Sequence, residues 1–275
     1  MISKIKLLVL SCLLFPGPLA AGTSLEKFTT RGDMLGWEAV GRVDLGKGSF
    51  CTGVLIAPDQ VLTAAHCLFD SKTGAPLDAK DIRFRSGYLN GRSLSDRSVK
   101  KYVISEGYEH SSGSYALDVI AKDVALLKLE YPISDSEAAP FLLHQDGAAV
   151  TRVQVMSYGQ GRAEAMSWQR QCDKLFQDYR LMAFDCDITF GSSGAPVFAM
   201  QGTRVRILSL VSGLTNGKDG RNLVIGVQLQ RLVGDLQRRI RSGDIALPNS
   251  GAAAKRITVG GGKRLSGAKF LTSKQ

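Results

Sequence analysis

The chain has 275 residues, of which 44% are hydrophobic and 22% are charged, so its composition is close to that of an average globular protein. This length allows one large domain or two small ones. The formal net charge is +10, but two lysines lie at the N-terminus and six basic residues in the last 25 positions; without them about +2 is left. The charge therefore gives no evidence for a nucleic-acid-binding face, and we expect no nucleic-acid partner.

The N-terminus has the pattern of a secretory signal. The two lysines precede an apolar run, Leu7–Phe15, and Pro16–Gly22 supplies small residues that suit cleavage near Ala20 or Ala21. A membrane anchor or a buried strand is the alternative, although the apolar run is too short to span a bilayer. We predict a signal peptide at 1–21 and a secreted or periplasmic protein with no integral membrane segment after its removal.

Four cysteines remain after the signal: Cys51, Cys67, Cys172 and Cys186. In an oxidising compartment they predict two disulfides, and three connectivities are open. Zinc is the alternative, but the sequence has no Cys-x-x-Cys pair and three histidines in all. We therefore predict neither a metal nor a cofactor.

Beyond a possible propeptide or N-terminal extension at 22–35, short apolar runs alternate with turn residues and predict strands in an all-β barrel or sandwich. These runs are Trp37–Leu45, Phe50–Pro58, Gln60–Leu68, Ile82–Leu89, Ser98–Glu106, Asp123–Glu130, Thr151–Gly159, Ala195–Met200, Arg204–Gly213 and Leu223–Leu229. One helix is predicted within Val227–Gly243, where apolar residues recur every three or four positions. The folded domain would span 36–243, followed by a basic, Gly-rich flexible tail at 244–275.

The stretch TFGSSGAPVF (Thr189–Phe198) raises the question of a nucleophilic serine. A serine hydroxyl needs a histidine to remove its proton, a group that orients the histidine, and N–H donors for the oxyanion. The histidines are His66, His110 and His144. A lone histidine is most often structural, so the neighbouring sequence must decide among them.

Three motifs in order resemble those of the trypsin/chymotrypsin-like serine peptidases: CTGVLIAPDQVLTAAHC (Cys51–Cys67), DVALLKL (Asp123–Leu129) and GSSGAPV (Gly191–Val197). The order histidine, aspartate, serine is that of this family. The resemblance covers roughly Trp37 to Ile240 and implies two packed six-stranded antiparallel β-barrels with a C-terminal helix. It also implies a Cys51–Cys67 disulfide. The second cysteine that trypsin has just before the serine loop is missing, and we expect Cys172 and Cys186 to pair across the intervening loop instead.

The resemblance assigns catalytic roles residue by residue. Ser193 is expected to be the nucleophile, His66 the general base and Asp123 the group that orients it. The backbone N–H groups of Gly191 and Ser193 are expected to form the oxyanion hole. Two other residues compete for these roles. Ser192 is adjacent to the nucleophile, but the family pattern places the nucleophile directly before Gly194. Asp118 rivals Asp123, but the apolar VALLKL segment directly follows Asp123.

The chain departs from the trypsin pattern at Ser192, which stands where trypsin-like zymogens have an aspartate that pairs with a new N-terminus. It also has no Ile-Val-Gly-Gly-like start near Gly22–Leu35. That activation switch does not carry over, and the sequence is closer to the bacterial, glutamyl-endopeptidase-like branch. For specificity, the resemblance points to Asp187, Ser212 and Gly213 as substrate-binding residues, with a preference for Arg or Lys before the scissile bond. Selectivity for glutamate is less favoured because Val211 stands where such relatives have a histidine. A structural role for Asp187 beside Cys186 is the alternative.

The sequence therefore predicts a secreted serine endopeptidase, acting on proteins or peptides as a monomer. A catalytically inactive peptidase-fold protein that serves as a binding module is the second hypothesis, although such proteins usually lose a triad residue and none is lost here. An esterase or lipase is a third, weakened by the lack of a strand–Gly-x-Ser-x-Gly–helix elbow.

Overall fold

The structure is a computed structural model. It describes residues 24–46, 48–110, 116–145, 149–178, 180–217, 222–243 and 269–271. The predicted signal peptide and all of the predicted tail except 269–271 lie outside the described residues.

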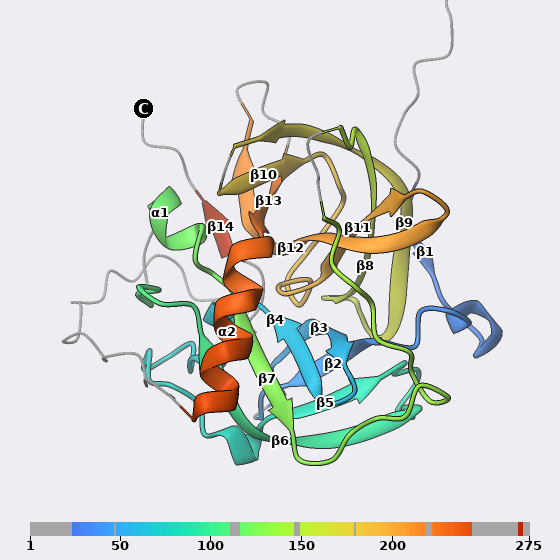
Figure 1. Cartoon of the computed structure of the whole chain (residues 1–275). Coiled ribbons are helices and arrows are strands. Elements are labelled where there is room, and N and C mark those ends of the chain that lie inside the picture. Colours follow the sequence, from blue (N-terminus) through green and yellow to red (C-terminus); the bar gives the residue numbers. More distant parts are fainter. Residues whose placement is uncertain are drawn as a thin grey trace, which may run out of the picture.

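The first half of the chain forms a closed antiparallel barrel of six strands (Figure 1). In barrel order these are β2 (Val40–Asp44), β3 (Phe50–Ala57), β4 (Gln60–Thr63), β7 (Ala125–Leu129), β6 (Ser95–Ile104) and β5 (Arg83–Ser86). Pairing of β5 with β2 closes the ring. Closure leaves no unpaired strand edge in this half of the fold.

The second half also closes into a six-stranded antiparallel barrel, because β9 pairs with β8 as well as with β10. Its strands in barrel order are β8 (Arg152–Gly159), β9 (Arg162–Gln177), β10 (Leu181–Phe184), β13 (Asn222–Gln228), β12 (Arg204–Asn216) and β11 (Pro196–Gln201). The predicted architecture of two packed six-stranded barrels is therefore confirmed.

Some strands, such as β3 and β12, are apolar on both faces because each face packs against a different core. In β3, Val54 belongs to the core between the barrels and Leu55 to the interior of the first barrel. In β12, Leu210 and Val211 divide in the same way between the core that joins the barrels and the interior of the second. Since strand side chains alternate at a period of two, burial on both sides gives nearly continuous apolar runs in the sequence.

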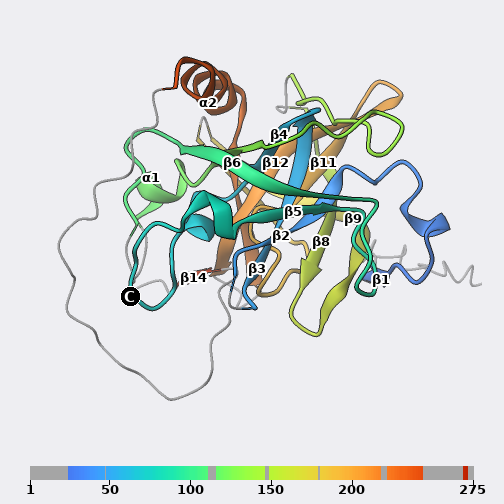
Figure 2. The ribbon, with the colours of Figure 1, turned by 90° about the horizontal axis from the view of Figure 1, so that it is seen from below.

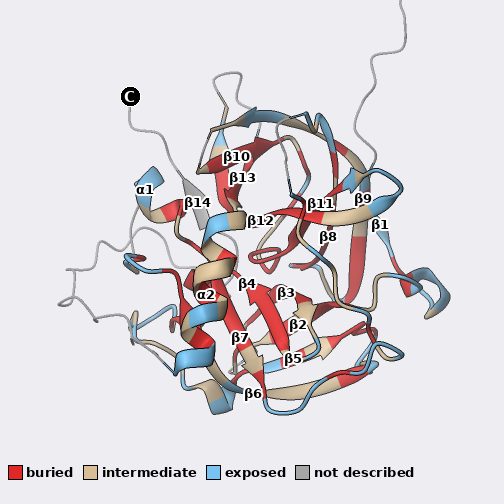
Figure 3. Ribbon diagram, in the orientation of Figure 1, coloured by how far each residue is buried: buried red, intermediate tan, exposed pale blue. Residues whose placement is uncertain are grey.

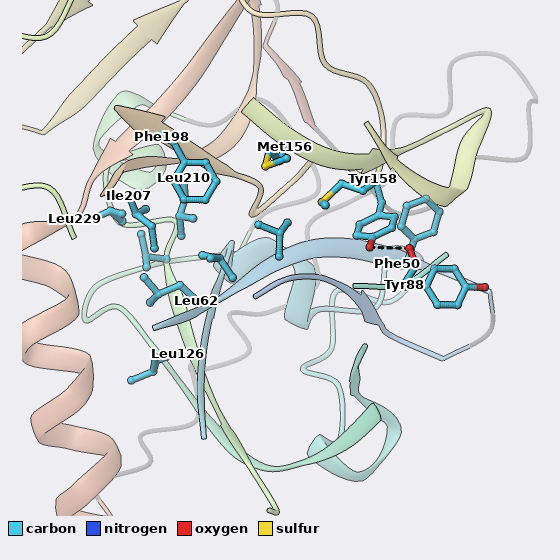
Figure 4. Packing of buried hydrophobic residues seen from close by; sticks show 14 of the residues in the cluster. Phe50, Leu62, Tyr88, Leu126, Met156, Tyr158, Phe198, Ile207, Leu210 and Leu229 are labelled. Atoms are coloured by element: carbon cyan, nitrogen blue, oxygen red, sulfur yellow. Dashed lines mark hydrogen bonds between the residues drawn. The ribbon is translucent and has the colours of Figure 1, made fainter. Parts of the chain in front are cut away.

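The core between the barrels holds the two halves together. It combines Leu62 and Leu126 of the first barrel with Met156, Phe198 and Leu210 of the second (Figure 4). All five side chains are fully buried. Figure 3 shows that buried residues run through the strands of both barrels, whereas exposed residues gather in the connections and on the outer side of the long helix. The site described below depends on this packing, because it draws side chains from both barrels.

The predicted C-terminal helix is confirmed as α2 (Gln230–Ser242), which follows the second barrel but packs against β6 and β7 of the first (Figures 1 and 2). Val233, Leu236 and Ile240 form its buried face, and Gly243 ends it in a left-handed conformation. None of the helices in the described ranges has the length and apolarity needed to cross a bilayer.

The remaining elements are short. They are η1 (Gly32–Met34), η2 (Ala65–Leu68), η3 (Ala79–Asp81), α1 (Leu117–Ile120), β1 (Glu26–Lys27) and β14 (Lys269–Leu271). β1 pairs with β9, and Phe28 beside it is buried, so the described part of the predicted N-terminal extension packs on the second barrel. β14 pairs in parallel with Gly213–Thr215 of β12.

Candidate active site

His66 lies in η2, directly after β4, and is 5% exposed. The two residues before it, Ala64 and Ala65, are fully buried, and their small side chains let this segment pack closely against the first barrel. A disulfide joins Cys67 to Cys51 in β3, so the segment is covalently tied to the barrel wall. The imidazole is thus held by an inflexible part of the backbone.

Asp123 is 4% exposed and lies in the connection between α1 and β7, where its carboxylate accepts hydrogen bonds from two residues. Oδ1 accepts from the backbone N–H of His66 at 2.8 Å. Oδ2 lies 2.6 Å from His66 Nδ1 and also accepts from the hydroxyl of Ser212 in β12. A buried carboxylate is stable only when such donors replace its hydration. Because Nδ1 faces the carboxylate, we assign the proton to Nδ1, which leaves Nε2 as a proton acceptor.

Ser193 is fully buried at the start of the segment that leads into β11. Its carbonyl oxygen accepts from the backbone N–H of Thr52 in β3 at 2.9 Å, and the N–H of the following Gly194 donates to Val211 at 2.8 Å. Val211 precedes Ser212, so the same stretch of β12 holds both the serine segment and Asp123. Ser193 is thereby fixed between the two barrels.

The hydroxyl of Ser193 and Nε2 of His66 are both buried, and neither forms a hydrogen bond with any described residue. The backbone N–H groups of Gly191 and Ser193 likewise donate to no described residue. Gly191 has φ of +92°, and a Cβ at this position would overlap the ring of Phe50. Glycine is thus required for this backbone conformation. Among the described residues, the site thus contains a hydroxyl, an imidazole nitrogen and two N–H donors that have no partner.

The three other residues with predicted substrate-binding roles lie in different surroundings. Asp187 is exposed, and its backbone N–H donates to the side chain of Gln169 at 2.7 Å. Ser212 bonds to Asp123, a contact that the sequence reasoning did not anticipate. Gly213 is buried in β12, where its Cα partners are Ile225 of β13 and Lys269 of β14.

The competing candidates lie elsewhere. Asp118 is on α1 and forms an ion pair with Arg180 at 2.9 Å. His110 stacks on Phe69 with ring centroids 4.2 Å apart, and the backbone N–H of His144 donates to Ile207.

Sequence reasoning missed Arg162, whose guanidinium donates to Ser157 and Ser192. A single arginine after the turn Gly159–Gly161 has no pattern that distinguishes it from a solvated charge. Its partners are 5 and 30 residues away, and the second becomes visible only once the barrel is folded.

Both predicted disulfides are present, Cys51–Cys67 and Cys172–Cys186. The two sulfur atoms of the first disulfide and one imidazole nitrogen of His66 lie within 4.8 Å of one another, which is close enough to suggest a metal site. Because the sulfur atoms are bonded to each other, they are not thiolate ligands, and the grouping reflects the packing of the disulfide against His66.

Comparison with known proteins places these observations in a family. The profile of the Trypsin family matches residues 29–231. The chain is 26% identical over 171 residues to a glutamyl endopeptidase of Bacillus licheniformis, covering 61% of this chain and 51% of that protein. It is 33% identical over 115 residues to a trypsin of Sarcophaga bullata, covering 41% and 39% of the two chains. The alignments thus span about half or less of these curated relatives.

Solved structures support the fold. A Glu endopeptidase in complex with MPD matches with a TM-score of 0.64 at 16% identity, covering 81% of this chain and 98% of that one. A thermostable serine protease, AL20, matches with a TM-score of 0.60 at 17% identity, covering 74% and 97%.

Gly194 provides a test of how tightly the serine segment packs against the first barrel. A Cβ there would lie 2.5 Å from the carbonyl oxygen of Thr52 and 2.7 Å from the backbone nitrogen of Ala64, and φ is +75°. Gly202 has φ of +61° and no atom within 4 Å of such a Cβ, so it is a matched control. We expect Gly202→Ala to lower the free energy of unfolding by about 1–2 kcal/mol, from backbone strain alone. Gly194→Ala should lose about 1–3 kcal/mol more, from the clash.

Urea denaturation of both variants with disulfides intact measures this difference. Equal losses in the two variants would contradict the close contact between the serine segment and β3–β4.

Proposed function

Because the chain belongs to the trypsin family of serine peptidases, we propose that it is a serine endopeptidase in which Ser193, His66 and Asp123 form the catalytic triad. The proposal rests on the buried contact between Asp123 and His66 Nδ1, which leaves Nε2 without a partner among the described residues. The segment that carries His66 packs beside Ser193, because the backbone of Ala64 lies close to Gly194. The free hydroxyl of Ser193 supports its role as the nucleophile.

In the proposed reaction, Ser193 Oγ attacks the carbonyl carbon of the scissile peptide bond while His66 Nε2 accepts the hydroxyl proton. His66 then gives this proton to the leaving amine, and the acyl-enzyme remains. Water attacks the acyl-enzyme by the same proton transfers in reverse and releases the acid. Asp123 holds the tautomer of His66 and stabilises the imidazolium ion.

The oxyanion of each tetrahedral intermediate is proposed to accept hydrogen bonds from the N–H groups of Gly191 and Ser193. Their lack of acceptors among the described residues supports this role. Such donors act strongly in a site that excludes water, and loss of a single one typically lowers kcat by about 10²–10³-fold.

The triad is tested by covalent labelling and by hydrolysis of a peptide substrate. We expect a fluorophosphonate to label the wild-type protein at Ser193 and not to label Ser193→Ala. Ser193→Ala and His66→Ala should each lower kcat/KM by at least ~10³-fold, because triad members act as a unit. Ser136→Ala, at an exposed serine, is the control and should still be labelled at the wild-type rate.

Comparable activity in either triad variant would exclude the assignment. A well-folded wild-type protein with neither labelling nor hydrolysis would instead support the second hypothesis, a peptidase fold that binds without turnover.

We also infer that the protein is exported, from its N-terminal pattern and its two disulfides, which persist in oxidising compartments. N-terminal sequencing of the protein recovered outside the cytoplasm should give a start near Gly22, after cleavage at Ala20 or Ala21. Recovery of the intact Met1 terminus in the cytoplasmic fraction would refute export.

The finer proposal concerns specificity, and it assigns a preference for Arg or Lys to Asp187. This residue lies six positions before Ser193 and is exposed, so its carboxylate is accessible to a substrate. The backbone contact with Gln169 fixes the position of its main chain. An anionic group at this position would favour a cationic side chain before the scissile bond.

Substrates that differ only at this position test the idea. We expect the wild-type protein to cleave after Arg and Lys at least ~10-fold faster, in kcat/KM, than after Glu or Leu, the equivalent of about 1.4 kcal/mol. Asp187→Ser should weaken cleavage after Arg and Lys and leave the other substrates unchanged. An equal loss on all substrates would mark Asp187 as structural, and a wild-type preference for Glu would refute the proposal.

A further inference from the structure

Ser192 is fully buried, and its side chain is enclosed by the second barrel. Its hydroxyl lies 3.1 Å from the hydroxyl of Ser157 in β8 and 3.2 Å from Nη2 of Arg162 in β9. On the main chain, its N–H donates to Thr189 at 3.0 Å and its carbonyl accepts from Ala195 at 2.9 Å. Ser192 is therefore the best-anchored residue of the segment that carries the proposed oxyanion donors on either side of it.

Arg162 provides the link between this segment and the barrel wall. Its Nη1 donates to the carbonyl of Ser157 at 2.6 Å, and Nη2 donates to the hydroxyls of Ser157 and Ser192 at 3.0 and 3.2 Å. Its guanidinium packs over Gly159, where a Cβ would lie 2.8 Å from Cζ of Arg162. One planar group thus holds Ser157 of β8 and Ser192 of the turn before β11 in a fixed relation.

The same β8–β9 hairpin fixes the other side of Gly191. The backbone N–H of Gln160, in the turn before Arg162, donates to the carbonyl of Phe190 at 2.6 Å. The hairpin therefore holds the peptide group before Gly191 through Gln160 and the residue after it through Arg162. The orientations of both proposed oxyanion donors depend on these contacts.

The charge of Arg162 is unusual for its surroundings. No carboxylate of the described residues lies within ion-pair distance of its guanidinium. Burial lowers its pKa to about 10, and the negative charge of Asp187 opposes this shift. The group is still a cation at neutral pH. A largely buried cation that bonds to neutral acceptors is disfavoured in a structural role alone, because apolar packing would fill the same space more stably.

We propose that Arg162 is a positioning residue that holds the oxyanion donors of Gly191 and Ser193 in their active orientation, through its hydrogen bonds to Ser192 and Ser157. This inference rests on the proposed function, since the donors matter only if Ser193 is the nucleophile. Arg162 of β9 would thus keep the serine segment in place although the side chain at position 192 is uncharged.

Steady-state kinetics of Arg162→Gln test the role, with Arg170→Gln as the matched control. Arg170 lies on the same strand, is exposed, and pairs with Glu26, so its loss removes the same charge away from the site. We expect Arg162→Gln to lower kcat by about 10–100-fold, because small displacements of catalytic donors have effects of this size. KM should change less than ~3-fold, because substrate binding does not need the donors. Arg170→Gln should keep wild-type kcat.

Fluorophosphonate labelling gives a second measurement, because the phosphoryl oxygen of the adduct would use the same two N–H donors. The labelling rate of Arg162→Gln should fall in parallel with kcat. Arg162→Lys keeps the charge but cannot donate to both serines from a planar group, so it should restore the labelling rate in part. A purely structural role would instead lower the fraction of folded protein and leave the labelling rate of the folded fraction unchanged.

Ser192→Asp completes a double-mutant cycle with Arg162→Gln. Next to Arg162, the new carboxylate gains a cationic partner, and kcat should stay within ~10-fold of wild type. In the Arg162→Gln background it would be buried without a partner, so the double variant should be less active than the product of the two single effects predicts. The cycle is scored per mole of folded protein, determined from the near-ultraviolet circular dichroism signal.

Strictly multiplicative effects, or an Arg162→Gln kcat within ~2-fold of Arg170→Gln, would overturn this inference. A wild-type protein that is not labelled at Ser193 would overturn the proposed function instead, so the two failures are distinguishable.

Discussion

The buried carboxylate of Asp123 is the contact on which the site depends. It accepts hydrogen bonds from the N–H and the imidazole of His66 in the first barrel and from Ser212 in the second. Because the carboxylate of Asp123 is buried, each of its oxygen atoms needs such donors. Loss of a donor would leave part of its negative charge uncompensated. This requirement fixes the two barrels relative to each other at the point where Ser193 lies. The apolar core packs the two barrels together, and the carboxylate fixes His66 relative to the part of β12 that also contacts the serine segment.

The segment that carries Ser193 is also fixed against the first barrel, by close backbone packing and not by a buried carboxylate. Gly191 and Gly194 both have positive φ, and each approaches the first barrel more closely than a side chain would permit. Among the described residues, the N–H groups of Gly191 and Ser193 have no acceptor, which is costly for buried donors. The contacts of Thr52, Val211 and Ser192 hold the segment against this cost. These contacts fix the backbone of the serine segment, and among the described residues this backbone offers no acceptor to the N–H groups of Gly191 and Ser193.

Sequence reasoning succeeded where chemistry is encoded by neighbouring residues. The motifs around His66 and Asp123 are local, and the structure places these two side chains in contact. The apolar period of α2 is likewise visible without any tertiary information. The assignment of Ser193 as the nucleophile stays a prediction. Sequence reasoning failed where partners are distant or strands are polar. The long strand β9, Arg162–Gln177, was not predicted because charged and amide side chains interrupt its apolar positions. The bond from Ser212 to Asp123 joins residues 89 positions apart, and no local pattern indicates it.

Under the two proposals, Arg162 and Asp187 connect the position of the serine segment with the charge of the substrate. The carboxylate of Asp187 acts on the guanidinium of Arg162, although the two form no ion pair. The positive charge of Arg162 therefore weakens the negative potential that a cationic substrate side chain would meet near Asp187. Two effects of removing this charge can be separated by their kinetic signature. Under the proposals, release of the serine segment would lower kcat for every substrate, whereas a stronger field from Asp187 would lower KM by less than ~3-fold, and for cationic substrates alone. The charge of Arg162 would weaken the attraction of a cationic substrate side chain. Its hydrogen bonds to Ser157 and Ser192 therefore fit a role in positioning the serine segment better than a role in attracting substrate.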